Sequence, residues 1–472
     1  MRKILLGVAG GLILLAGGYL YADAQDWVPG WITAAPEDIP QAPFITAAPV
    51  AGIAATVPVE VLDADAPRPS ATVVQGLARD LRADDRTGAS TNVSVIDYLD
   101  GTVYADLGAS DPQVPASTTK LLTAVAAVAE LGADFRTTTA VTWDEPTSTL
   151  TLVAGGDVML AAGDGHGGDV PAGTDAAQGW AGLGDLAAQV AAFFGDDAPG
   201  AVTLRVDDEA FPGPAWPAEW PEYAFNLGYA SPVTGLAVNG GRLTDENYGP
   251  RAEDPSLHAG EQLVVALRAE GLKVRGEVTH ASSRNRAQEI ASVDSAPLAE
   301  VARHLLSVSD NTVAEAVARV LALETGRNAT PTGAANAMAA SLSGLGADVT
   351  GLQLYDGAGF SARNQIAPIT LTTSMTVARD EPELDGLLDW LPLSGLEGTV
   401  EDRYSDTEVA GFWRAKTGSL TGVTAISGVL VTADGRALAV ALLADGMPYG
   451  QDRPQEAFDE FLAALAQCGC AE

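Results

Sequence analysis

Several short segments of the chain are rich in apolar and β-branched residues and are bounded by polar turn residues, a pattern that predicts β-strands. Residues 91–98 have this composition, the pair Asp100-Gly101 follows as a turn, and residues 102–106 return to it. A second pair of runs, 424–432 and 437–443, flanks another polar turn that contains glycine. Glycine-containing turns between such runs are typical of hairpins. The sequence therefore predicts two antiparallel hairpins, one near each end of the folded part.

Elsewhere apolar residues recur every three or four positions, which predicts amphipathic helices. One such helix begins at Ser117 and ends at Gly132, because glycine commonly closes a helix. Further helices are predicted over Leu298–Ser307, Val313–Glu324, Ala334–Leu345 and about 454–466.

The segment between about 140 and 290 has a different character. Short apolar runs alternate there with clusters of Gly, Asp and Pro, and a single helix is predicted at about Leu183–Phe194. We therefore predict a discontinuous domain formed by 71–140 and 291–467, interrupted by an inserted β-rich domain at 141–290.

The N-terminus predicts an export signal. A basic start, Met1-Arg2-Lys3, precedes the apolar run Ile4–Leu20 and the small residues Ala22-Asp23-Ala24. This pattern is typical of a signal peptide over 1–24, and the run is also long enough for an uncleaved membrane anchor. Both alternatives place the rest of the chain outside the cytoplasm. Residues 25–70 are rich in Ala and Pro and predict an extended linker.

Composition narrows the class of function. The 472 residues include 26 Lys+Arg and 62 Asp+Glu, a net charge of −36, which argues against a nucleic-acid partner. An apolar fraction of 47% is enough for a large core. The two cysteines, Cys468 and Cys470, are too close together for an unstrained disulfide, and no role is assigned to them.

The first chemical candidate is Ser117-Thr118-Thr119-Lys120, at the predicted start of a helix. Positions i and i+3 share a helix face, so the Ser117 hydroxyl and the Lys120 amine can touch. A lysine whose pKa is lowered by burial can act as the base that activates a serine nucleophile. The alternative is an ordinary N-cap serine.

The second candidate is Lys416-Thr417-Gly418-Ser419, ahead of the C-terminal hairpin. A strand with this sequence offers a cation, a hydroxyl and an edge without side-chain bulk at glycine. A peptide substrate can pair along such an edge, and Lys416 can hold a carboxylate. The alternative is a turn with an exposed lysine.

A third motif, Ser-x-Asn, occurs three times, at Ser90-Thr91-Asn92, Ser283-Arg284-Asn285 and Ser309-Asp310-Asn311. Only the third lies between two predicted helices, which form a rigid platform for catalytic groups. Ser309 or Asp310 is also a good N-cap for the following helix, and capping and catalysis are compatible.

In this order, the three motifs resemble those of the D-alanyl-D-alanine carboxypeptidases/endopeptidases of the class C low-molecular-mass penicillin-binding proteins. The resemblance covers about 71–160 and 295–445. It departs from the family pattern at Ala358, where serine is usual, and at Glu397, where aspartate is usual. The strings that carry it are PASTTKLLTA at 115–124, VSDNTVAEAVAR at 308–319, DGAGFSARN at 356–364, LPLSGLEGTVEDRY at 391–404 and AKTGSL at 415–420.

The resemblance implies the α+β class, with a penicillin-binding/β-lactamase-like transpeptidase domain in which helices flank an antiparallel sheet. It implies an acyl-enzyme on Ser117, with Lys120 as base, Ser309 relaying a proton, and Asn311 and Lys416 completing the catalytic set. The substrate-binding residues would be Thr417, Gly418 and Ser419, with the backbone N–H groups of Ser117 and Ser419 as the oxyanion hole. No metal or cofactor is implied.

The implied activity is serine-type D-Ala-D-Ala carboxypeptidase action on peptidoglycan stem peptides, with D,D-endopeptidase cleavage of cross-links as a second possibility. β-Lactams would be covalent inhibitors. Location would be extracytoplasmic, facing the cell wall, secreted or anchored through residues 4–20. A β-lactamase and a catalytically inactive cell-wall binding protein of the same fold remain the alternatives.

A metal site is not predicted either. The glycine-rich loop around His166 fits neither a zinc nor an EF-hand signature.

Overall fold

The computed structural model of the chain describes residues 62–467 apart from 88–89, 171–174, 283–286, 405–406, 408 and 448–451. The predicted signal segment, most of the predicted linker, Ser283-Arg284-Asn285 and the two cysteines lie outside the described residues. Within the described ranges, no helix is long and apolar enough to cross a membrane.

The first of two sheets joins the two ends of the described chain. It has five antiparallel strands in the order β2-β1-β10-β9-β8. Both predicted hairpins are confirmed, and they meet where β1 pairs with β10, Ser90 lying opposite Asp445. The strands are β1 (Ser90–Asp97), β2 (Val103–Leu107), β8 (Trp413–Leu420), β9 (Val423–Val431) and β10 (Ala437–Asp445).

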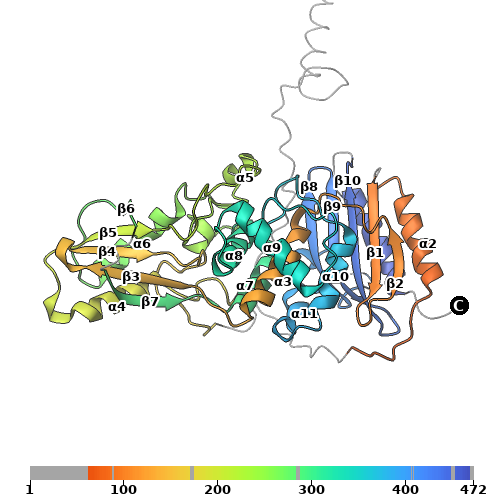
Figure 1. Ribbon diagram of the computed structural model, residues 1–472, viewed down its shortest axis with the longest axis horizontal. Helices are drawn as coiled ribbons and strands as arrows, with labels where there is room; N and C mark the ends of the chain where they lie inside the picture. The colour runs from red at the N-terminus through yellow and green to blue at the C-terminus, as the bar shows by residue number, and fades with distance from the viewer. Residues whose placement is uncertain are drawn as a thin grey trace, which may run out of the picture. The chain divides into compact units, whose positions relative to one another are not determined.

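Helices cover both faces of this sheet (Figure 1). Leu438, Val440 and Leu442 of β10 pack on one side with α2 (Ala71–Arg82) and α12 (Asp452–Ala466). The residues between them in the strand face the other side, where α10 (Pro368–Ala378) lies. Successive side chains of a strand point to opposite faces, so β10 has to be apolar throughout. Helices α2 and α10 were not predicted.

A helical layer beside the sheet carries two of the three candidate motifs, the one at Ser117 and the one at Ser309. Helix α3 is buried on nearly all sides and ends at Gly132, whose φ of 88° suits glycine. It packs against α7, α8 and α9, and the three helices predicted in that region are confirmed. The elements are η1 (Ala116–Thr118, a 3₁₀ turn), α3 (Thr119–Leu131), α7 (Leu298–Ser307), α8 (Asn311–Glu324) and α9 (Pro331–Leu345).

The second sheet lies in the inserted segment, in the order β6-β5-β4-β3-β7. The predicted limits of the insertion, 141 and 290, fall inside β3 and β7, the two strands that lead into and out of it. Strands β4, β5 and β6 are mutually parallel, whereas β3 pairs antiparallel with both of its neighbours. The strands are β3 (Thr138–Asp144), β4 (Thr149–Val153), β5 (Thr203–Asp207), β6 (Thr279–His280) and β7 (Gln288–Asp294).

Two long helices, α4 (Leu183–Phe194) and α6 (Pro255–Ala269), share a core with this sheet. Helix α4 is confirmed with its predicted limits, but the prediction of a single helix was wrong because it missed α6. Its start has two clear signals: Pro255 is the first helical residue, and the Asp254 side chain accepts the Leu257 N–H. Short helices α5 (Tyr223–Asn226) and α11 (Leu387–Trp390) complete the α-helices of the described chain.

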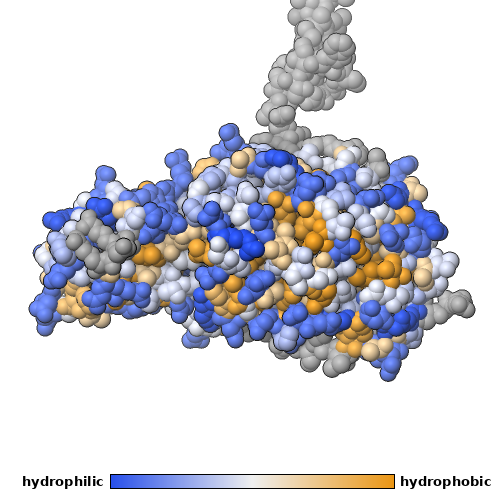
Figure 2. Space-filling view, in the orientation of Figure 1, coloured by the Kyte–Doolittle hydropathy of each residue, from blue (hydrophilic) through white to orange (hydrophobic). Residues whose placement is uncertain are grey.

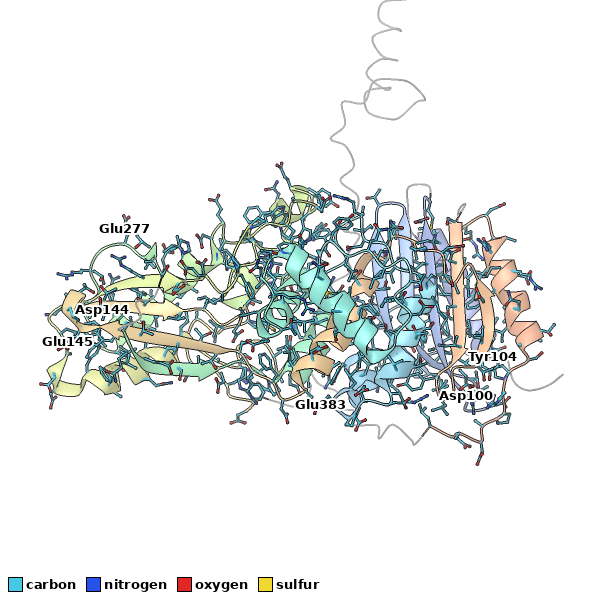
Figure 3. The ribbon with its side chains drawn as sticks, viewed as in Figure 1. Asp100, Tyr104, Asp144, Glu145, Glu277 and Glu383 are labelled. Atoms are coloured by element: carbon cyan, nitrogen blue, oxygen red, sulfur yellow. The ribbon has the colours of Figure 1, made fainter. Side chains whose placement is uncertain are left out.

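The chain enters the discontinuous domain, called the first domain from here on, beside a buried ion pair. Arg436 Nε donates to Asp97 Oδ2 at 2.7 Å, and Tyr104 donates its hydroxyl to the same oxygen at 2.9 Å. Arg436 Nη1 also donates to the Ala64 carbonyl at 2.7 Å. Asp100 lies near this group, at one end of β1 and β2 (Figure 3). The end of the predicted linker is thus tied to the sheet.

Acidic side chains are common on the surface, as the net charge of −36 requires. Hydrophilic residues dominate the face seen in Figure 2, and apolar residues gather over the region of α9, α10 and β1. At the end of the second sheet where β3 turns into β4, Figure 3 shows Asp144 and Glu145, with Glu277 nearby. Such a surface favours solubility and repels polyanions.

Candidate active site

The Ser117 hydroxyl and the Lys120 amine meet inside the first domain. Ser117 lies in the η1 turn and Lys120 in the first turn of α3, and Lys120 Nζ is 2.9 Å from Ser117 Oγ. Both residues are buried, with exposed fractions of 2% and 0%. The i, i+3 spacing therefore places the two groups in contact, as predicted.

Lys120 Nζ has two further partners, both fixed acceptors. Asn311 Oδ1 lies 2.7 Å away and the carbonyl of Ala358 lies 2.6 Å away. A neutral lysine amine has two N–H groups and one lone pair. When the two N–H groups bond Asn311 and Ala358, the lone pair remains for the Ser117 hydroxyl, the geometry that a general base requires.

Burial lowers the pKa of Lys120 to about 7, because the charged form loses its hydration. The negative charges of Asp356 and Asp310 act in the opposite direction and favour the ammonium form. Burial, together with the charge of Lys120, also holds the pKa of Lys416 well below its ordinary value. The neutral amine of Lys120 is thus accessible near neutral pH.

A buried carboxylate shapes the turn that presents Ala358. Asp356 Oδ1 accepts the backbone N–H groups of Ala358 and Gly359, and Oδ2 accepts the Ser361 N–H and, at 3.1 Å, the Trp220 indole N–H. These bonds converge on one side chain and fix the direction of the Ala358 carbonyl. The contact to Lys120 uses backbone only, so alanine in place of the usual serine leaves it intact.

The close approach of this turn to the nucleophile depends on glycine. Gly359 has a φ of 77°, and a Cβ added there would lie 1.9 Å from the Ala116 carbonyl oxygen. Ala116 itself has a positive φ of 48°. Any side chain at residue 359 would push the turn away from Ser117.

Of the two Ser-x-Asn motifs that lie within the described residues, Ser309-Asp310-Asn311 is the one whose asparagine contacts Lys120. Ser309 is 3% exposed and precedes the first turn of α8. Asp310 is the N-cap, its Oδ1 accepting the Val313 N–H at 3.0 Å. Asn92 of the first motif instead bonds the Asp111 carbonyl.

The Lys416-Thr417-Gly418 motif lies on β8, the edge strand of the first sheet. Lys416 is fully buried, and its Nζ donates to the Thr417 carbonyl at 2.8 Å. The Thr417 hydroxyl bonds Thr399 at 2.9 Å. A Cβ added at Gly418 would lie 2.7 Å from the Pro115 oxygen and 3.1 Å from the Ser117 nitrogen. Glycine therefore lets β8 lie against the backbone of the nucleophile turn.

Ser419 follows on the same strand, opposite Thr424 of β9. Within the described part of the chain, β8 has no strand partner on its other side, apart from one bridge between Leu393 and Arg414. The stretch from Lys416 to Ser419 is thus an edge to which an extended peptide can be added.

Sequence reasoning missed the contribution of the inserted segment to this site. The Tyr229 carbonyl accepts the Asn311 side-chain N–H at 3.0 Å, and Trp220 bonds Asp356. His304 of α7 is buried and hydrogen-bonds Asp175 of the inserted segment. An Asp followed by Gly-x-Gly at 356–359 was the available signal for the carboxylate-centred turn; the contacts from the insertion have no local signal.

A serine and lysine in contact, an asparagine on the lysine, and a Lys-Thr-Gly edge strand beside the serine turn define the class of active-site serine enzymes with a penicillin-binding fold. The chain matches the family model described as D-Ala-D-Ala carboxypeptidase 3 (S13) over residues 74–251 and 246–467. It belongs to this family, and the predicted resemblance is confirmed.

Two curated relatives match nearly the whole chain. Carboxypeptidase DacB of Mycolicibacterium smegmatis is 34% identical over 98% of this chain and 97% of its own. A carboxypeptidase of Mycobacterium tuberculosis is 33% identical over 92% and 90%. The assignment as a serine-type D-Ala-D-Ala carboxypeptidase therefore holds along the full length.

Among solved structures, penicillin-binding protein 4 (dacB) of Haemophilus influenzae superposes with a TM-score of 0.66 and covers 82% of this chain and 98% of its own. The same protein in complex with a β-lactam superposes with a TM-score of 0.60. Sequence identity is 20% in both cases, so this likeness shows the fold alone. It confirms the predicted α+β penicillin-binding fold.

Proposed function

We propose that this enzyme removes the terminal D-alanine from peptidoglycan stem peptides that end in D-Ala-D-Ala, through an acyl-enzyme on Ser117. The observation that carries the proposal is the buried Lys120 amine, 2.9 Å from Ser117 Oγ and bonded to Asn311 and Ala358. Family membership supports the reaction class, and the curated relatives are carboxypeptidases by name.

Acylation begins when Lys120 Nζ takes the proton of the Ser117 hydroxyl. Ser117 Oγ then attacks the carbonyl carbon of the penultimate D-alanine, and the tetrahedral oxyanion is held by the backbone N–H groups of Ser117 and Ser419. The C–N bond breaks, and the proton passes from Lys120 to the departing amine of D-alanine, with Ser309 as relay.

Deacylation reverses the roles with water as nucleophile. Water attacks the ester carbonyl while giving a proton to Lys120, the bond to Ser117 Oγ breaks, and Ser117 recovers the proton.

Substrate binding precedes both steps. The free carboxylate of the bound substrate lies near Lys416 and Thr417 until acylation releases it as part of D-alanine. Asn311 binds a substrate amide, and the peptide extends along β8 by strand addition.

β-Lactams would acylate the same serine, because their strained amide occupies the place of the scissile bond. The test is the intact mass of the purified full-length protein after incubation with benzylpenicillin, wild type beside Ser117→Ala. We expect a stoichiometric adduct on the wild type and none on the folded variant. An adduct on Ser117→Ala would refute the nucleophile.

The same experiment separates the alternatives. Recovery of intact penicillin without an adduct would favour a catalytically inactive binding protein of the same fold. Hydrolysed penicillin without a lasting adduct would favour a β-lactamase. Two product assays then distinguish the activities. Release of D-alanine from a stem-peptide substrate indicates carboxypeptidase action, and conversion of cross-linked muropeptides to monomers indicates endopeptidase action.

For location, we propose export through the N-terminal segment, either as a cleaved signal or as an anchor formed by residues 4–20. The support is the sequence pattern of residues 1–24. Fractionation of cells followed by N-terminal sequencing tests this proposal. Full-length protein in the membrane fraction indicates an anchor, a mature chain shortened near Ala24 indicates a cleaved signal, and full-length protein in the cytoplasm contradicts both.

A further inference from the structure

Ser309 has a backbone conformation that needs outside support. Its φ is 61°, in the left-handed region that side chains other than glycine seldom adopt. Such a residue is strained and persists only where its surroundings hold it. The next two residues, Asp310 and Asn311, are buried and are both bonded to the inserted segment.

Asp310 is held by an arginine that lies far from it in the sequence. Arg242 Nη2 donates to Asp310 Oδ2 at 2.8 Å, and the exposed fractions of the two side chains are 11% and 4%. The other carboxylate oxygen accepts the Val313 N–H as the cap of α8. Asp310 therefore links the insertion to the first turn of α8, directly beside Ser309.

The segment that carries Arg242 is itself well fastened. Residues 242 and 251 pair as an antiparallel bridge. Arg251 is buried and donates from Nε to the Gly228 carbonyl at 3.0 Å and from Nη1 to the Gly240 carbonyl at 3.1 Å. Arg242 Nη1 donates to the Asn239 carbonyl at 3.3 Å. Arg242 is thus presented by a rigid loop.

Two more contacts from the same part of the insertion reach the next residues of α8. The Asn311 side-chain N–H donates to the Tyr229 carbonyl at 3.0 Å, and the Ser231 N–H donates to the Thr312 hydroxyl at 2.9 Å. Asn311 is the residue that bonds Lys120 through its other side-chain atom. Its amide is therefore oriented between the insertion and the candidate base.

A second cation approaches Asp310 from α7. His304 Nδ1 is hydrogen-bonded to Asp175 of the insertion, and its Nε2 lies 3.9 Å from Asp310 Oδ2. Burial opposes the charged imidazole, but Asp175 and Asp310 outweigh it and raise the pKa of His304 to about 9. Asp310, itself buried, has its pKa held well below the usual range by Arg242 and His304. The carboxylate thus lies between two cations.

We propose that the inserted segment contributes to the active site through Arg242, which acts as a positioning residue. Its ion pair with Asp310 keeps Ser309 and Asn311 in the geometry needed for acylation. The proposal rests on the proposed function and gives the insertion a role in it. Arg242 touches neither the nucleophile nor the base and acts only through Asp310.

The test compares Arg242→Gln with the wild type and with Arg205→Gln, an exposed arginine of β5 in the same segment. Each full-length protein reacts with benzylpenicillin, and intact mass records both the rate constant and the final amount of adduct. We expect Arg242→Gln to acylate about ten- to a hundredfold more slowly, since small misplacement of reacting groups has effects of this size. The final adduct should remain stoichiometric, and Arg205→Gln should match the wild type.

Rate and amount separate positioning from folding. A variant that is merely destabilised contains less active protein, so the amount of adduct falls while the rate constant of the remainder is unchanged; that result would overturn the proposal. A wild-type rate in Arg242→Gln would overturn it as well. A wild type that forms no adduct and releases no D-alanine would instead contradict the proposed function.

A second variant covers the case in which Arg242→Gln does not fold. Asp310→Asn keeps an oxygen for the Val313 N–H and removes the charge that Arg242 binds. We expect Asp310→Asn to slow acylation as well. Adding the control substitution Arg205→Gln to it should change neither the rate constant nor the amount of adduct. In the double variant with Arg242→Gln the two losses should not multiply, because one ion pair underlies both. A rate in Asp310→Asn equal to that of the wild type would refute the proposal.

Discussion

Lys120 Nζ lies 2.9 Å from Ser117 Oγ, although the two residues belong to different elements, a 3₁₀ turn and the helix that follows it. The amine is fully buried, and burial favours its neutral form. A base held in this way is ready to accept the serine proton without first losing a proton at high pH. This relationship determines the pH dependence of the enzyme.

Because the pKa of Lys120 is lowered to about 7, the acylation rate should depend on pH in a defined way. Below this value Lys120 is protonated and accepts no proton, so the rate should fall about tenfold per pH unit. Above it the rate should level off. Stopped-flow acylation by a chromogenic β-lactam between pH 5 and 9 measures this profile. A midpoint near the ordinary lysine value would contradict it, and Lys120→Ala should be inactive throughout.

Asp356 should shift that profile. Its negative charge favours the protonated form of Lys120, so Asp356→Asn should lower the pKa of Lys120 and move the midpoint to lower pH. The plateau rate should also fall. The asparagine side chain has one oxygen in place of two, so it cannot accept all the backbone N–H groups of the 357–361 turn that now bond Asp356. The exposed Asp389 provides the control, Asp389→Asn. A midpoint that stays in place or rises would show that Asp356 acts in another way.

Gly418→Ala should impair the reaction through sterics. The added Cβ would lie 2.7 Å from the Pro115 oxygen, a distance that forces β8 and the nucleophile turn apart. We expect acylation at least tenfold slower, with a modest loss in melting temperature. Gly344→Ala in α9 is the matched control, since its Cβ would meet no atom within 4 Å. Equal acylation rates in the two variants would show that the edge tolerates a side chain.

Asp157 should make stability depend on pH. It lines a cavity of about 40 Å³ and its Oδ1 accepts the Met159 N–H at 2.8 Å. Burial raises its pKa from 3.8 to about 6 in the folded state, against the opposite effect of the Met159 bond. The folded state therefore binds this proton more tightly, and stability is lost as pH rises from about 4 through 6, by up to about 3 kcal/mol.

Asp157→Asn removes this loss and retains an oxygen for the Met159 N–H. The variant should unfold at higher denaturant concentration than the wild type at pH 8, and the difference should shrink toward pH 4. Urea titrations at the two pH values measure both effects. A variant that is less stable than the wild type at pH 8 would show that the carboxylate is stabilising and charged.

Much of the fold follows from local patterns. The hairpins near 91–106 and 424–443 and the helix α4 were predicted because each has its own periodicity and turn residues, which act over a few positions. Helix α6 was missed although Asp254 and Pro255 mark its start, because the segment as a whole was interpreted as β-rich. Helix α10 lacks a polar face, so periodicity does not indicate it.

The candidate site divides in the same way. The sequence by itself determined the residue types and their local placement: Ser117 three residues before Lys120 at the start of a helix, a Ser-x-Asn between two helices, and a Lys-Thr-Gly strand. Their chemistry depends on spacings of three or four residues, which the backbone geometry sets directly.

Only the tertiary structure decided which groups surround Lys120. The acceptors Asn311 and Ala358 are about 190 and 240 positions away from Lys120 in the chain. Packing of separate elements brings the charge of Asp356 close enough to act on the Lys120 amine, and it brings Arg242 of the insertion to Asp310. Contacts of this kind leave no periodic trace in the sequence, because they arise when separate elements pack. The low pKa of the base and the role of the insertion are therefore properties of the folded molecule, produced by burial and by distant charges.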